Sequence, residues 1–416
     1  MNNFGSLYTY ELKKICKRRL VCVTLGIMML MLVLMYLVGP LTETWTMFDG
    51  EKDIQMKGYE YAVYEKEKAQ KLAGLKIDDA LLEEVKEAYS GVYKEHLDDS
   101  LSVNMLVSEA TDEEQKDFIQ KRLQYDQIYL FVSCVTGNYN SVHNMTEDAL
   151  YQIRENQYQE RETGLRLSKQ EKAYWAEQDS MIEKPFTYGY VGGWDKILDE
   201  MMMLNFMLIL TIGICLANVF SEEHSRKTDQ LILCSKHGKN VLQYAKLAAG
   251  ATFGLGCGII FLGFMVICAL GIYGADGFDV AFQIAFPNCA RNMTIGQMVL
   301  IRSAIFLASS ILYSVIVMSL SEILKNGVVV MGIMLGAVYF TLLFNVPYEH
   351  RAFSQLYNLI PIRLLSGENA ADYRLTQIGN LFFTNYQSGL ILYLFISLVL
   401  IMIVNRCYKR YQVSGR

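Results

Sequence analysis

Three features of self-sufficient enzymes are missing from this sequence. It has no GxxxxGKS or GxxxxGKT phosphate-binding loop and no HExxH zinc motif. Its five histidines are scattered, so they support no Ser/His/Asp arrangement. The spacings among His224, Cys234 and His237 match no common zinc pattern, and we interpret these residues as ordinary polar side chains. We therefore expect a chain that is not an enzyme and that binds no metal or cofactor of its own.

Charge is also missing from the centres of the longest apolar runs. Apolar residues make up 52% of the chain, and they gather in six blocks of about 20 residues, the length that crosses a bilayer. The blocks are 20–41, 199–220, 247–273, 298–320, 327–346 and 388–404. Membrane-embedded ionisable residues usually mark proton and ion relays, so their absence disfavours a self-sufficient pump or secondary transporter. We predict an all-α polytopic membrane protein with six transmembrane helices.

The nine cysteines do not form a disulfide framework. Seven fall in the apolar blocks or in segments predicted to be cytoplasmic: Cys16, Cys22, Cys215, Cys234, Cys257, Cys268 and Cys407. Only Cys134 and Cys289 are expected outside, where one disulfide between them is conceivable. Scattered cysteines are more often small apolar residues, and we favour that interpretation.

Basic residues beside the short loops indicate the orientation, because cytoplasmic loops carry an excess of Lys and Arg. Five bases precede the first block: Lys13, Lys14, Lys17, Arg18 and Arg19. With six crossings, both termini are predicted to be cytoplasmic. The segments 1–19, 221–246, 321–326 and 405–416 then lie inside, and 42–198, 274–297 and 347–387 lie outside.

The segment 42–198 is the one large polar insertion, and it carries most of the acidity. Between Leu41 and Lys196 there are 31 acidic and 18 basic residues, whereas the rest of the chain has a net charge of +8. A basic inner side and an acidic outer domain argue against nucleic acid as a partner. The acidity could concentrate a cationic substrate. Solvation of exposed helices explains it as well, and we favour solvation.

Helix signals recur through 42–198. Ser168 with Glu171, and Thr111 with Glu114, fit the capping box, and Thr146 fits an N-cap. A 3.6-residue stripe predicts a helix with one buried face. Its members are Ile77, Ala80, Leu81, Val85, Ala88, Tyr89, Val92, Tyr93 and His96. We predict a helical extracytoplasmic domain of four to six helices and no sheet.

The loop between the second and third blocks reads FSEEHSRKTDQLILCSKHGKNVLQYAKLAAG from Phe220 to Gly250. This order resembles the segment between spans two and three in the membrane subunits of type-2 ABC exporters. That family has an acid pair, a Gly- or Lys-Thr step, a Leu-rich turn and a Lys that opens the next span. The matching residues are Glu222, Glu223, Lys227, Thr228, Leu231, Ile232, Leu233, Lys239 and Lys246. The family often has Pro and Arg after the Leu-rich turn, where this chain has Ser235 to Gly238.

Other segments resemble the same family. LYTYELKKICKRRL, within 1–19, is similar to its amphipathic elbow helix, with Phe4, Leu7, Tyr8, Leu12 and Ile15 at helical spacing. The start of the fourth block and YNLIPIRLL before the sixth are also similar. The resemblance implies short re-entrant helices in 347–387. The insertion 42–198 resembles those of the branch that exports peptides, antibiotics or sodium.

The resemblance implies a function as well as a fold. Two such permease subunits, alike or different, would pair in lipid in a bacterial plasma membrane, above separate cytoplasmic ATPases that bind ATP and Mg. A short coupling helix, about 228–235, would dock in a groove of the ATPase through an apolar turn rimmed by charge. The expected coupling residues are Glu222, Glu223, Lys227, Thr228, Asp229, Leu231, Ile232 and Leu233. The substrate would be a peptide, an antibiotic or another amphiphile moved outward.

Glycines recur at four-residue spacing in two apolar blocks. Gly250, Gly254 and Gly258 form two GxxxG steps, and Gly332 with Gly336 forms another. Small faces let helices approach closely. We expect these glycines to pack helices within the subunit, with a dimer seam as the alternative.

Two other classes of function remain. The chain could be a membrane-anchored sensor whose outer domain binds a ligand, but all its predicted inner segments are short. It could be an intramembrane enzyme, but the apolar blocks hold no paired polar residues. An ATPase partner would distinguish the exporter from both.

Overall fold

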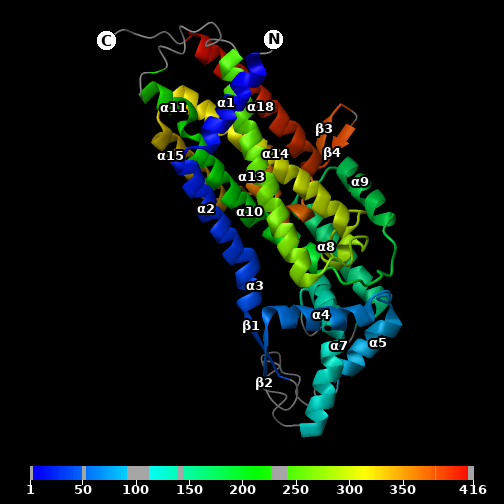
Figure 1. Ribbon diagram of the computed structural model, residues 1–416. Coiled ribbons are helices and arrows are strands. Elements are labelled where there is room, and N and C mark those ends of the chain that lie inside the picture. Colours follow the sequence, from blue (N-terminus) through cyan, green and yellow to red (C-terminus); the bar gives the residue numbers. More distant parts are fainter. Residues whose placement is uncertain are drawn as a thin grey trace.

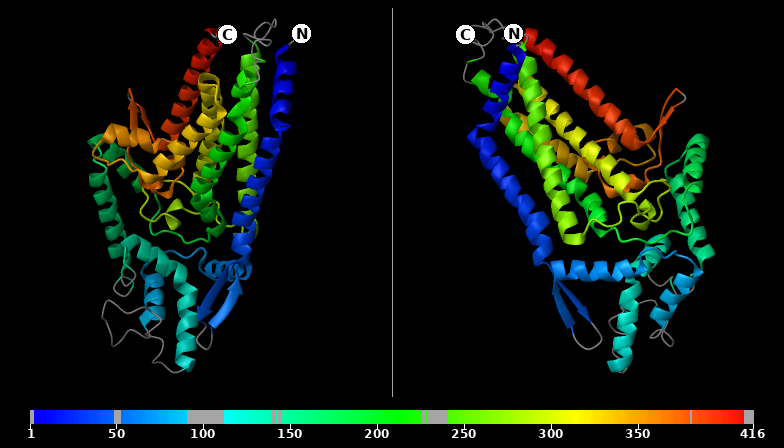
Figure 2. Two further views of the ribbon diagram at one scale, coloured as in Figure 1. Left: turned by 90° about the vertical axis from the view of Figure 1, so that its left-hand side faces the viewer. Right: turned by 45° about the vertical axis from the view of Figure 1, so that its right-hand side comes forward.

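The computed structural model describes residues 3–48, 53–90, 112–138, 142, 145–225, 228, 241–379 and 381–410. Most of these residues are helical. Long helices form a bundle at one end, and a smaller domain of shorter helices covers the other end (Figure 1). The described chain ends near residues 3 and 410 lie together at the far end of the bundle (Figure 2).

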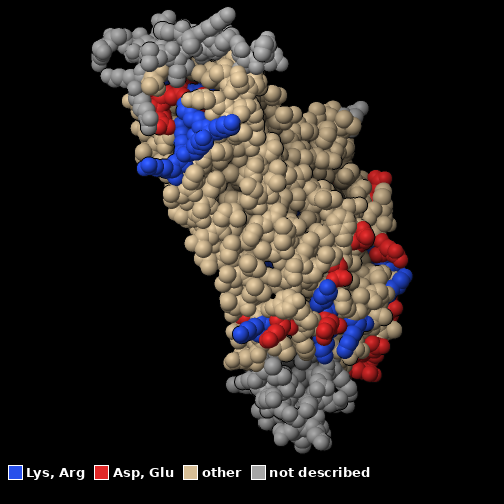
Figure 3. All heavy atoms as spheres, viewed as in Figure 1, with Lys and Arg blue, Asp and Glu red and all other residues tan. Residues whose placement is uncertain are grey.

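Five helices are long and apolar enough to cross a membrane, which fits the expectation of a polytopic helical protein. They are Arg19–Thr42, which joins α2 (Arg19–Val33), η1 (Leu34–Val38) and α3 (Gly39–Thr42); Gly192–Ser225, which joins α10 (Gly192–Leu216) and α11 (Asn218–Ser225); α13 (Val241–Tyr273); α14 (Ile295–Leu324); and most of α18 (Asn385–Arg410). Figure 3 shows, on one face, a broad uncharged band over these helices between charged regions at the two ends. Such a band is what contact with lipid requires.

The fifth apolar block, 327–346, forms a shorter helix than expected. α15 covers Gly327–Leu343, which is 17 residues or about 25 Å of helix, less than the ~30 Å hydrocarbon core. It starts at Gly327 as predicted, because Lys325 ends α14 in a left-handed conformation and the Asn326 side chain accepts from two backbone N–H groups of α15. It ends where Phe344 becomes extended. A count of six full-length spans is therefore not supported by helix length.

The first long helix changes its winding near the polar domain. In η1, the Gly39 N–H bonds to the Leu34 carbonyl five residues back, which is the π-helical pattern. Pro40 follows and cannot donate to the carbonyl of Tyr36, so the ordinary ladder cannot continue there. The π turn carries Met35 and Tyr36 into a pocket described below.

α1 (Asn3–Cys16) is a separate helix inside the expected elbow segment 1–19. Arg18 has an extended backbone and separates α1 from α2, and the two helices meet at a bend (Figure 2). α1 packs on α13, where the Tyr8 hydroxyl donates to Thr252 Oγ1 at 3.1 Å. Ile15 is buried in the bundle core.

The polar domain follows α3 and begins with a hairpin, so the expectation of no sheet was wrong. β1 (Thr44–Phe48) pairs antiparallel with β2 (Asp53–Lys57). β1 alternates Thr with aromatic and apolar residues, a composition that favours strands. The Trp45 ring stacks on Tyr61 with 4.6 Å between centroids. The expectation had considered only the 3.6-residue signals of this segment.

Five described helices make up the rest of the polar domain. They are α4 (Gly58–Leu72), α5 (Asp79–Ser90), α7 (Asp112–Thr136), α8 (Glu147–Gly164) and α9 (Lys169–Ser180). The capping box of Ser168 and Glu171 and the N-cap at Thr146 are confirmed. The predicted stripe is buried at Ile77, Leu81, Val85, Ala88 and Tyr89, whereas Ala80 is exposed. Thr111 and the end of the stripe lie outside the described residues.

The two loops that face the polar domain are themselves structured. The 274–297 loop holds the short helix η4 (Phe282–Ile284). The 347–387 loop holds α16 (Arg351–Asn358), α17 (Pro361–Leu364), η5 (Gly367–Ala371) and a hairpin of β3 (Thr376–Ile378) and β4 (Leu381–Phe383). Tyr158 and Trp175 of the polar domain form one core with Tyr373 of this loop. These contacts fix the polar domain to the helix bundle.

Candidate functional site

The predicted coupling segment is described only at its start. Glu222 and Glu223 lie in α11, and the Thr228 N–H and hydroxyl donate to the Glu223 carbonyl at 3.0 and 3.2 Å. Lys227, Asp229, Leu231, Ile232 and Leu233 lie outside the described residues, and so do Lys239, Cys234 and His237. Of the predicted coupling residues, the structure therefore describes only Glu222, Glu223 and Thr228.

The Glu223 carboxylate joins three helices. The residue is only 9% exposed, and the Lys14 ammonium of α1 donates to Oε1 at 2.6 Å. The Lys246 ammonium of α13 is fully buried and pairs with Oε2. A buried charge is costly unless it is paired, so each of these groups depends on the others. We call Lys14, Glu223 and Lys246 the ion cluster.

Other side chains extend the ion cluster. Arg18 Nη2 pairs with Glu222 Oε2 at 2.7 Å, which adds the joint between α1 and α2. The Lys246 ammonium also lies 5.1 Å from the centroid of the Phe220 ring, in cation–π geometry. Phe220 in turn contacts Tyr408 of α18 edge to face, with 6.4 Å between centroids. The acid pair therefore links α11 to α1, to α13 and to the joint between α1 and α2, and Phe220 adds a contact with α18.

The predicted glycine contacts divide into two groups. Gly250, Gly254 and Gly258 face α14 closely: a Cβ on Gly254 would lie 1.9 Å from Ser314 Oγ and 2.9 Å from the Ser310 carbonyl oxygen. These three glycines therefore lie against α14 of the same subunit. Gly332 and Gly336 of α15 differ, because a Cβ on either would meet no described heavy atom within 4 Å. We expected these two glycines to pack against another helix of the subunit, but no described residue packs closely against them.

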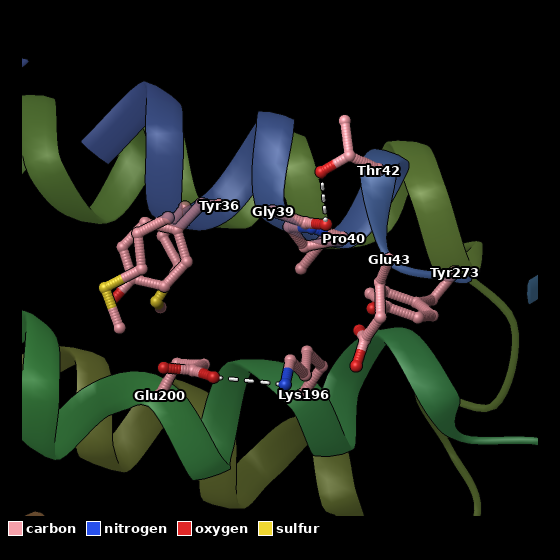
Figure 4. A pocket seen from close by; sticks show the side chains of 11 residues that line it. Tyr36, Gly39, Pro40, Thr42, Glu43, Lys196, Glu200 and Tyr273 are labelled. Carbon is pink, nitrogen blue, oxygen red and sulfur yellow. Dashed lines mark hydrogen bonds and ion pairs between the residues drawn. The ribbon is translucent and has the colours of Figure 1, made fainter. Parts of the chain in front are cut away.

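A polar pocket lies between the first, second and third long helices where they approach the polar domain (Figure 4). Its volume is about 370 Å³. η1 and α3 form one wall, α10 supplies Lys196 and Glu200, and α13 supplies Met265, Ala269 and Tyr273. Lys196 Nζ and Glu200 Oε1 pair at 3.1 Å across one helical turn. Nothing in the sequence alone singled out this pocket.

A second cavity, of about 460 Å³, is lined almost wholly by apolar groups of α10, α14, α15, α16, α17 and α18. The hydroxyls around it have partners in the chain. Tyr393 donates to the Leu359 carbonyl at 2.7 Å, and Tyr357 donates to the Phe344 carbonyl at 2.8 Å. The cavity is therefore suited to an apolar group and not to a charged one.

Buried arginines hold the polar domain against the loops. Arg154 pairs with Asp179 at 2.7 Å and donates to the carbonyls of Pro287 and Cys289. Arg291 donates to the carbonyls of Ala370 and Asp372. Arg374 pairs with Asp372 at 2.6 Å, and both side chains are buried.

Two buried carboxylates of the polar domain, Glu171 and Asp179, have shifted pKa values. Burial acts to raise the pKa of Glu171, but donors from Arg351, the Leu375 N–H and Ser168 hold it below its usual value. The pKa of Asp179 is likewise lowered, because Arg154 and Lys184 outweigh its burial. These contacts are therefore strongest when the carboxylates are ionised.

No group of three or more metal-binding side chains occurs among the described residues. His224 is exposed on α11. Cys134 and Cys289 are both free thiols, and Cys289 is buried. The disulfide considered for this pair is not formed.

Comparisons with protein families, curated proteins and solved structures find no match for this chain. The resemblance of the segment 220–250 to type-2 ABC exporters thus rests on its own residues. The sequence did not predict the ion cluster, because Lys14 was used only as an orientation signal and Lys246 as part of the family resemblance. The acid pair at 222–223 is complementary in charge to the run of bases at 13–19. This complementarity could have predicted ion pairs between the two segments.

Proposed function

We propose that this chain is the permease subunit of an ATP-driven exporter in a bacterial plasma membrane. It works as a pair of subunits, identical or related, with both termini cytoplasmic and α1 at the inner membrane surface. Separate ATPases bind ATP and Mg beneath it. The substrate is a peptide, an antibiotic or another amphiphile, which the apolar cavity could accommodate in part.

One observation carries the proposal: the segment that resembles a coupling segment begins at a buried ion cluster. Glu223 lies near the start of that segment and pairs with Lys14 of α1 and Lys246 of α13. A displacement of the 226–240 segment would therefore move α1, α11 and α13 together. This is the rigid connection that transmission from an ATPase to membrane helices requires.

The test uses the apolar turn that would dock into the ATPase. The tagged chain is captured from native membranes, and any co-purified protein with a phosphate loop is identified. We expect the wild-type chain to retain such an ATPase and the L231D/L233D double variant to lose it. Leu75→Asp, at a position 42% exposed in the polar domain, is the matched control and should retain it. Absence of an ATPase from the wild-type capture, or its retention by the double variant, would contradict the proposal.

A membrane-anchored receptor is the second candidate function. A cavity of about 760 Å³ favours it, because the cavity lies between residues 181–188 of the polar domain and residues 277–297 at the bundle. A receptor would bind its ligand there without an ATPase partner. The same capture experiment therefore separates the two functions.

A further inference from the structure

The pocket of Figure 4 contains a polar group that the described chain leaves unsatisfied. Tyr36 is 6% exposed, and its hydroxyl makes no hydrogen bond within the described residues. The ring extends from η1 toward the helix that carries Glu200 (Figure 4). A buried hydroxyl without a partner costs about 1–3 kcal/mol, so a native structure keeps one where a ligand or water completes it. The π turn that holds Tyr36 is itself a feature frequent at functional sites.

The charges around the pocket favour a cation. Glu43 and Glu200 supply two carboxylates, and Lys196 supplies one ammonium. Lys196 is already paired with Glu200, and Glu43 forms no ion pair within the described residues. A carboxylate has about four acceptor positions, so one lysine leaves Glu200 able to accept another donor. The pocket therefore has more free hydrogen-bond acceptors than free hydrogen-bond donors.

The remaining lining suits a short apolar body beside that cation. Met35, Met265 and Ala269 are apolar, and the rings of Tyr36 and Tyr273 border the space. The volume of about 370 Å³ admits a small molecule or one lipid headgroup, and it is too small for a folded peptide. Thr42 does not add a free donor, because its hydroxyl donates to the Val38 carbonyl at 2.7 Å.

We propose that this pocket binds a primary ammonium group attached to a small apolar body. The ammonium lies at the end of the pocket where Tyr36 faces Glu200, and it donates to the Glu200 carboxylate and to the Tyr36 hydroxyl oxygen, while Glu43 at the other end adds negative charge (Figure 4). The apolar body lies against Met35 and Met265. This site is defined by binding alone and does not depend on the exporter function, so either proposal can fail without the other.

The test measures binding of 2-phenylethylammonium to the purified full-length chain in phosphatidylcholine nanodiscs by saturation-transfer NMR titration. We expect saturable binding, with 2-phenylethanol at least tenfold weaker and phenylacetate not binding. Glu200→Gln should weaken binding about tenfold, and Tyr36→Phe about threefold, the fold-changes of a charged and a neutral hydrogen bond.

Nanodiscs that contain phosphatidylethanolamine distinguish the natural source. Competition by that lipid identifies its headgroup as the occupant, and unchanged affinity identifies a free amine.

A variant that is expected to bind the ammonium more tightly distinguishes a specific effect on the pocket from general damage to the fold. Lys196→Met removes the competing ammonium from Glu200 and should tighten binding severalfold, an effect that misfolding cannot produce. Glu83→Gln, at an exposed surface pair in the polar domain, is the neutral control. Binding of phenylacetate at least as tight as that of the ammonium would overturn the proposal. So would wild-type affinity in both Glu200→Gln and Tyr36→Phe.

Discussion

The fully buried ammonium of Lys246 donates to the carboxylate of Glu223, which is itself 9% exposed. This pair joins α13 to the end of α11, and Lys14 adds α1 at 2.6 Å. The acid pair thus has an internal role that is independent of any partner.

The ion cluster predicts a large loss of stability when its carboxylate is removed. Glu223→Gln leaves Lys246 buried without a counter-charge, and the loss of one partner of a buried pair costs about 3–5 kcal/mol. We expect a decrease of that order in the free energy of unfolding, measured by denaturant titration in mild detergent. The double variant E223Q/K246M should recover most of the loss.

Glu222→Gln is the matched control for this prediction. Glu222 is paired with Arg18, but its side chain is 31% exposed, and such pairs contribute less than about 1 kcal/mol. A loss in E222Q as large as that in E223Q would show that burial does not govern the cluster.

The glycines of α13 and α15 predict opposite results for the same substitution. Gly254→Ala places a methyl group 2.9 Å from the backbone oxygen of Ser310, which cannot rotate away, so we expect a cost of about 1–3 kcal/mol. Gly332→Ala meets no described atom within 4 Å and should be neutral or stabilising by up to about 1 kcal/mol, because alanine favours helix. Thermal unfolding of both variants in the same detergent provides the comparison. Equal effects would contradict the close approach of α13 and α14.

Long apolar helices could be predicted from the sequence because bilayer thickness fixes their length. α15 differed at its C-terminal end, because the chain becomes extended at Phe344, which a hydropathy block does not resolve. The β1–β2 hairpin was missed because strand alternation over five residues is a weak signal beside long helical stripes. The pocket at Tyr36 could not be predicted, because it depends on a π turn and on how three distant helices pack.

The buried carboxylate of Glu171 predicts that docking of the polar domain depends on pH. Although burial opposes it, the donors around Glu171 lower its pKa in the folded protein below the usual 4.5. The stabilisation is therefore complete above the unfolded-state pKa and is lost as pH falls through the folded-state pKa. The protection factors of the α9 amides, which correct for the intrinsic pH dependence of hydrogen exchange, should fall in wild type between about pH 5 and pH 3.

Glu171→Gln tests the origin of that pH dependence. It should have lower α9 protection factors already at pH 7 and show a smaller further decrease at low pH. Glu183→Gln is the control, since its side chain is 80% exposed and its contact with Lys76 is 3.5 Å long. Identical pH profiles for E171Q and wild type would exclude Glu171 as the group responsible.

Two of the exposed cysteines, Cys134 and Cys407, lie at opposite ends of the molecule and provide a test of its orientation in the membrane. Cys134 is exposed in the polar domain, and Cys407 is exposed near the end of α18 where the chain termini lie. If the termini are cytoplasmic, a membrane-impermeant maleimide added to intact cells should label a variant that keeps only Cys134. A variant that keeps only Cys407 should react only after permeabilisation.

The buried Cys289 is the control and should not react in either condition, because its thiol is enclosed between the loops. Labelling of Cys407 but not Cys134 in intact cells would reverse the orientation and remove the ATPase-facing role of the 226–240 segment.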